Sequence, residues 1–153
     1  PLSMKTKKQN LTAITLIELL VSIGVIMATI GMVATFIKYQ KPNIELSGAA
    51  NDLKSALNEA RQLSLTTQSK HGVKFFLPSN SYQILLLSGA SAVLASSTLP
   101  QNIEYESIGA WAGDTVSFNA AGGASAAGNI ILQNSFNQTK QIIISPSGYV
   151  HIE

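Results

Sequence analysis

The sequence predicts an α+β fold in which a long N-terminal helix packs on a mainly antiparallel β-sheet. Three observations predict it: an apolar run from Ile14 to Ile37, an amphipathic stretch with a helical period to about Thr67, and a series of short β-rich runs after it. About 115 residues follow the apolar run, which is enough for one small domain with one core. The expected divisions are a leader over residues 1–13, an apolar helix over 14–37, its amphipathic continuation over 38–67 and a globular β domain over 68–153.

The apolar run is about as long as a helix that crosses a bilayer, which needs roughly 20 residues. Lys5, Lys7 and Lys8 precede it, and no comparable basic cluster follows it closely. Because cytoplasmic flanks carry the excess of Lys and Arg, this asymmetry predicts a cytoplasmic leader and an extracytoplasmic C-terminal domain. We therefore expect a single-pass protein of the inner (cytoplasmic) membrane, with Met4 as its native start.

Glu18 is the one ionisable residue of the apolar run. A charge at the centre of a membrane helix costs about 2.5 to 3.5 kcal/mol by insertion scales, so such residues usually have a partner. No other residue of the run can neutralise it. If the chain were cut after Ala13, the new α-amino group of Ile14 would supply a positive charge close to the depth of Glu18, on the same chain or on a neighbouring helix. A buried carboxylate of this kind can drive assembly.

Ala13 and the eight residues that follow, Ile-Thr-Leu-Ile-Glu-Leu-Leu-Val, resemble the class III signal of type IV pilins and type II secretion pseudopilins. The resemblance implies that a prepilin peptidase cuts between Ala13 and Ile14 and N-methylates Ile14. It also implies that Glu18, at the fifth mature position, serves in assembly. Ala13 stands where the family normally has Gly, a departure that bears on the efficiency of cleavage, and Ile14 stands where Phe is commoner.

Two simpler interpretations of the N-terminus remain open. A secretory signal peptide would have a shorter apolar core followed by a small-x-small cleavage site, and the nearest approach, residues 29–31, lies inside the apolar run. An uncleaved signal anchor with an incidental Glu18 is the other, and it would hold an extracytoplasmic enzyme or sensor domain. The uncleaved anchor predicts that the leader is retained.

Beyond the apolar run, Lys38, Tyr39 and Lys41 are typical of a membrane interface, where long cations and aromatic rings settle. Pro42 follows and predicts a bend, because proline lacks a backbone donor and crowds the preceding turn. Helical spacing then resumes, and apolar or small residues recur every three or four positions to form one face. These residues are Leu46, Ala50, Leu53, Leu57, Ala60 and Ser64.

The rest of the chain alternates β-rich runs with turns, which predicts the sheet under the amphipathic helix. Strands are expected over 71–77, 82–87, 103–108, 115–119, 130–133, 140–145 and 149–152. Residues 78–81 and 145–148 carry Pro, Asn, Ser and Gly at turn positions and predict hairpins. Two segments rich in Gly, Ala and Ser, 88–97 and 120–128, are expected to be mobile loops.

Residues 116–118, 128–132 and 142–150 follow one another as similar segments do in the minor pseudopilin H and FimT-like branch of the pilin superfamily, which the chain therefore resembles. Membership implies a non-enzymatic subunit at the tip of a filament. Its implied partners are other pilins or pseudopilins, the prepilin peptidase and the inner-membrane assembly platform. A competence-type minor pilin that takes up DNA is an alternative within the superfamily. It is less supported, because Tyr149 stands where such members frequently have Arg.

Charge and composition narrow the remaining functions. Without the three leader lysines the chain has seven basic residues against eight acidic ones, and its cations are scattered rather than clustered, so a nucleic-acid interface is not indicated. The chain has no cysteine, and His71 and His151 stand apart in the sequence, so we expect no metal, no cofactor and no catalysis. Trp111 either caps the core of the sheet, which we favour, or is an exposed contact for a partner.

Overall fold

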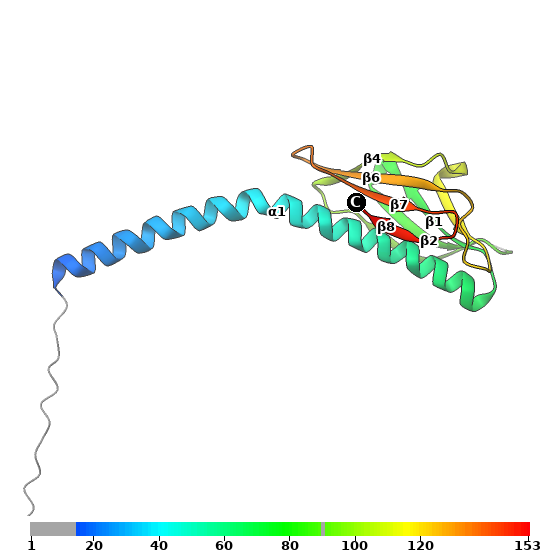
Figure 1. The fold of residues 1–153 in the computed structure, drawn as a ribbon, viewed down its shortest axis with the longest axis horizontal. Coiled ribbons are helices and arrows are strands. Elements are labelled where there is room, and N and C mark those ends of the chain that lie inside the picture. The colour runs from blue at the N-terminus through cyan, green and yellow to red at the C-terminus, as the bar shows by residue number, and fades with distance from the viewer. Residues whose placement is uncertain (1–14, 90) are drawn as a thin grey trace, which may run out of the picture. The chain divides into compact units, whose positions relative to one another are not determined.

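The protein is described by a computed structural model that covers residues 15–89 and 91–153. The chain divides into two compact units, Pro1–Lys38 and Tyr39–Glu153. Helix α1 (Leu16–Thr67) begins in the first unit and ends in the second (Figure 1). Pro42 lies inside α1, which continues as one helix on both sides of it. The predicted α+β fold, with a long N-terminal helix packed on antiparallel strands, is confirmed.

The C-terminal part of α1 packs through the face that the sequence predicts. Leu46, Leu53 and Leu57 have no exposed surface, and several alanines are buried between them. Alanine lets the helix approach the strands closely, while the leucines supply most of the apolar area. Lys41 and Glu45 form an ion pair of 3.6 Å one helical turn apart, in which Lys41 is exposed and Glu45 is half-buried, and the pair contributes little to stability.

The strands form two four-stranded antiparallel sheets rather than the single sheet expected from the sequence. In the first sheet the order is β3-β2-β1-β5, with β1 (His71–Phe76), β2 (Ser81–Leu86), β3 (Ala92–Thr98) and β5 (Thr115–Phe118). In the second the order is β4-β6-β7-β8, with β4 (Ile103–Ile108), β6 (Gly128–Asn134), β7 (Thr139–Ile144) and β8 (Val150–Ile152). Two 3₁₀ turns, η1 (Leu77–Ser79) and η2 (Ala112–Asp114), join strands of the domain. Both predicted hairpins, β1–β2 and β7–β8, are confirmed.

The expectation of a loop over residues 88–97 is wrong, because β3 occupies most of this segment. Its small residues pair with β2 in antiparallel register, from Ser81 opposite Thr98 to Leu86 opposite Ala92. Main-chain hydrogen bonds to a neighbouring strand hold this segment, and they do not require apolar side chains. The second small-residue segment, 120–128, is organised by Asn119, whose Oδ1 accepts the N–H groups of Ala121 and Gly123 at 3.0 Å each.

One hydrophobic core contains the buried face of α1 together with side chains from both sheets. Its aromatic part centres on Phe75, whose ring lies 5.9 Å from that of Tyr105 and 6.0 Å from that of Trp111. Burial raises the pKa of the Tyr105 phenol, and the neighbouring Tyr82 raises it further, so the hydroxyl stays uncharged in the core. The core therefore joins the two sheets to each other and joins both of them to α1.

Ser64 is a buried polar residue that joins α1 to the first sheet. Its hydroxyl lies 3.0 Å from the carbonyl of Ala60 and 3.1 Å from that of Phe118, and it accepts the N–H of His71 at 3.1 Å. We expect Ser64→Ala to destabilise the domain by about 1–3 kcal/mol, because buried backbone groups of β1 and β5 lose a partner. Urea unfolding of the full-length protein in detergent measures the loss.

Ser55→Ala is the matched control for this prediction, since it makes the same change on the same helix. Ser55 is exposed, and among the described residues its hydroxyl donates only to the carbonyl of Asn51 within α1. Its removal should change the unfolding midpoint very little. Equal losses for Ser55→Ala and Ser64→Ala would show that the connection from Ser64 to the strands does not stabilise the fold.

Candidate functional site

The first turn of α1 is closed by a cap that involves the predicted site residue Glu18. The side chain of Thr15 accepts the N–H of Glu18 at 3.3 Å, and the carbonyl of Thr15 accepts the N–H of Leu19 at 3.1 Å. Thr and Glu three residues apart at a helix start are typical of a capping box. The sequence Thr-Leu-Ile-Glu carries this signal, although the apolar residues on both sides make it easy to miss. Glu18 is also favoured here because the N-terminus of a helix attracts negative charge.

Leu16–Val33 presents an apolar surface on every side. None of these 18 residues is buried, and this is the one helix in the described part of the chain that is long and apolar enough to cross a membrane, judged by length and composition. Large side chains such as Leu16, Met27 and Met32 are at least 70% exposed. Apolar surface of this extent is unfavourable in water, which fits a helix that anchors the protein in a membrane.

The hydroxyl groups of this segment are satisfied within the helix. Ser22 donates to the carbonyl of Glu18 at 2.7 Å, and Thr29 donates to that of Ile26 at 2.8 Å. A polar group that bonds within its own helix does not need water, which suits a segment surrounded by lipid. Among the polar side chains of Leu16–Val33, the carboxylate of Glu18 is the one with no hydrogen bond or ion pair to a residue that the structure describes.

No ion pair is formed by Glu18 with any residue between 15 and 89 or between 91 and 153. Ala13 and Ile14, the predicted processing site, lie outside the described residues, as do the leader lysines Lys5, Lys7 and Lys8.

The other candidate residues have structural surroundings. His71 is buried, with its Nδ1 2.9 Å from the carbonyl of Ser69. His151 stacks on the exposed ring of Tyr149, and its Nε2 lies 3.9 Å from a carboxylate oxygen of Glu153. Within residues 15–89 and 91–153, no group of three or more His, Cys, Asp or Glu is placed to hold a metal ion.

Trp111 caps the core, as favoured from the sequence. The residue is 6% exposed, and its Nε1–H donates to the carbonyl of Ala126 at 3.2 Å. Gly109 and Gly128 lie against the ring so closely that a Cβ at either position would come within 3.0 Å of it. The two glycines therefore leave room for the indole between η2 and the start of β6.

The globular part of the chain matches a known family. A family model described as type II transport protein GspH matches residues 49–148, which is more than half of the chain. The chain belongs to the GspH family. The resemblance to the minor pseudopilin H branch is thereby confirmed, and GspH membership places the chain among pilin-type structural subunits, which are generally not enzymes. No curated protein sequence matches the chain.

Solved structures of low sequence identity share the GspH fold. The minor pseudopilin EpsH from the type 2 secretion system of Vibrio cholerae superimposes with a TM-score of 0.61 at 11% identity, covering 71% of this chain and 96% of EpsH. The type IV minor pilin FimU of Pseudomonas aeruginosa superimposes with a TM-score of 0.61 at 17% identity, covering 75% of this chain and 92% of FimU. At these identities the likeness establishes the fold alone.

Proposed function

We propose that this GspH-family protein is a minor pseudopilin or minor pilin that a prepilin peptidase processes and that assembles through its N-terminal helix. One observation carries the proposal: an exposed apolar helix with a single carboxylate, Glu18, in its first turn is joined to a GspH-type domain. The helix would be stored in the membrane and then transferred to a filament. In both places other apolar groups cover Leu16–Val33.

Glu18 and the processed N-terminus would form the polar contact of this assembly. Cleavage between Ala13 and Ile14 creates an α-amino group one helical turn from Glu18 on the same chain. In a staggered pair of helices, the amine of one subunit meets the carboxylate of its neighbour. Because an unpaired charge in an apolar environment is costly, subunits that provide this pair are favoured over those that do not. The pair therefore sets the axial register between subunits.

The proposed arrangement follows the divisions expected from the sequence. Residues 1–13 form the cytoplasmic leader, 14–37 cross the inner membrane, and 38–67 continue the helix into the globular domain outside. The partners are other pilins or pseudopilins, the prepilin peptidase and the inner-membrane assembly platform. As a minor subunit, the protein would occupy the filament tip. A role in protein secretion and a role in a type IV pilus use the same helix and the same processing.

Cleavage is the decisive test. The full-length protein, produced with a prepilin peptidase, should be recovered from membranes with a mass and N-terminal sequence that begin at N-methylated Ile14. Ala13→Gly should be processed at least as fast, since it restores the residue that the peptidase normally encounters. Recovery of a chain that still carries Lys5 to Ala13 would contradict the proposal and favour an uncleaved anchor.

A further inference from the structure

Strand β3 is an uncovered edge of the first sheet. It pairs with β2 on one side, and no strand of the described sheet lies on its other side. All seven of its residues are exposed, and none is charged or proline. A β-bulge at Leu94 twists one end, whereas Ala95–Thr98 keep a regular register with Ile84–Ser81. Charges, prolines or a covering element normally protect edge strands, so this regular segment is open to pairing with another strand.

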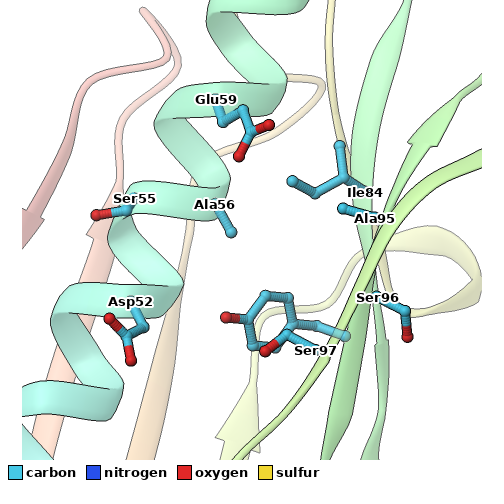
Figure 2. A pocket seen from close by; sticks show the side chains of 9 residues that line it. Asp52, Ser55, Ala56, Glu59, Ile84, Ala95, Ser96 and Ser97 are labelled. Atoms are coloured by element: carbon cyan, nitrogen blue, oxygen red, sulfur yellow. The ribbon is translucent and has the colours of Figure 1, made fainter.

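A groove runs beside this edge, between α1 and the β2–β3 pair (Figure 2). Its volume is about 200 Å³, and small residues create it: Ala56 on α1 faces Ile84 and Ala95 across the opening. Pockets for small molecules usually measure about 300–1,000 Å³, so this groove suits a single side chain better than a separate ligand. An extended segment paired to β3 would place alternate side chains toward it.

The groove is acidic and contains a free hydroxyl. Asp52 and Glu59 line it from α1, two helical turns apart on one face, and both are exposed. Neither forms an ion pair with any other residue that the structure describes. Tyr82 also lines the groove and is 6% exposed, and no protein group among the described residues hydrogen-bonds to its hydroxyl. Two carboxylates and a phenol are complementary to Lys or Arg.

We propose that the free edge of β3 and this groove together dock an extended segment of a partner that carries Lys or Arg. The main chain of the partner adds a strand to Ala95–Thr98, and its cationic side chain enters the groove between Asp52 and Glu59. This mode of recognition combines affinity from the backbone with specificity from one pocket. A symmetric pair of β3 strands from two copies of the chain does not fit, because β3 contains no cation that such a pair could bring to the groove.

The test uses the full-length protein in detergent and fluorescent seven-residue peptides. The first alternates Thr and Val around a central Lys, and its matched control has Glu in the central place. We expect the Lys peptide to bind at least tenfold more tightly in fluorescence anisotropy. A Lys peptide in which every backbone amide is N-methylated should lose binding, because neither of its edges can donate hydrogen bonds to β3.

Variants of the protein distinguish the effect of the carboxylates in the groove from the effect of the protein's overall charge. Asp52→Asn combined with Glu59→Gln should reduce the preference for Lys over Glu to within about twofold. Asp114→Asn combined with Glu106→Gln removes the same charge from exposed sites elsewhere and should leave the preference unchanged. Equal binding of the Lys and Glu peptides, absence of binding at millimolar concentration, or binding of the N-methylated peptide would each overturn the proposal.

Recognition of a basic strand at this groove does not depend on the proposed function. Asp52 and Glu59 lie far along α1 from the cleavage site, so their replacement should not affect processing at Ala13. A protein that is processed but binds no Lys peptide would refute the docking site alone. A protein that binds the Lys peptide but retains its leader would refute the processing alone.

Discussion

Glu18→Gln is expected to reduce incorporation into filaments by more than tenfold while the globular domain stays folded. Gln has nearly the same shape and also suits the third position of a helix, so the cap from Thr15 remains. The change removes the charge that would pair with the amine of Ile14. Breaking a buried ion pair by removing one partner costs about 3–5 kcal/mol, and about 1.4 kcal/mol already corresponds to tenfold. Immunoblots of sheared filaments against total protein measure the loss.

Two variants separate the role of the charge from other effects at this helix. Thr15→Ala removes the side-chain cap but keeps the carboxylate, so it should still assemble. Glu45→Gln removes a carboxylate from the same helix, at its ion pair with the exposed Lys41, and it should assemble normally. Normal incorporation of Glu18→Gln, or an equal defect in Thr15→Ala, would mean that the carboxylate of Glu18 does not drive assembly.

Gly148→Ala is expected to destabilise the domain by about 3 kcal/mol or more, a large effect for the addition of one methyl group. Gly148 has a φ of +78°, which costs an L-residue about 1–2 kcal/mol. A Cβ at this position would overlap the carbonyl oxygen of Gly122 and would lie 2.9 Å from Nε of Arg61. Overpacking of this kind typically costs about 1–3 kcal/mol more.

The overlap matters because it falls on a contact that joins three parts of the domain. Arg61 on α1 donates through Nε to the carbonyl of Gly122 at 3.0 Å, and the turn before β8 packs on both. Gly113→Ala is the control, since Gly113 has a φ of +62° but open space around its Cβ position. Thermal unfolding should show a small decrease for Gly113→Ala and a much larger one for Gly148→Ala. Equal decreases in the unfolding temperature would mean that the positive φ alone, and not the overlap with Gly122, causes the loss of stability.

Most of the secondary structure was predictable because side-chain patterns are local. The run from Ile103 to Ile108 was predicted with the bounds that β4 has, and β1, β2, β5, β7 and β8 were each predicted to within one or two residues. Strand β3 was missed because Ala, Ser and Thr give no apolar alternation. The segment becomes a strand through its hydrogen bonds to β2, a partner that local composition does not reveal.

The candidate functional residues likewise divide into those that the sequence predicted and those that only the folded structure brings together. Glu18 was identified from the sequence because it is the one ionisable residue in a long apolar run, which needs no tertiary structure to recognise. The groove at Asp52 and Glu59 was not, since each is an ordinary charge on the polar face of an amphipathic helix. Only the folded domain brings them beside Tyr82 and the edge of β3.

The sequence by itself determined the long N-terminal helix, its apolar and amphipathic parts, the position of Glu18 and the resemblance to the pseudopilin H branch. These features depend on residue type and spacing along one element. Tertiary structure decided the division of the strands into two sheets, the burial of Trp111 and the free edge of β3. Each of these depends on contacts between residues far apart in the chain, and the free energy of such contacts comes from burial and hydrogen bonding that exist only once the chain has folded.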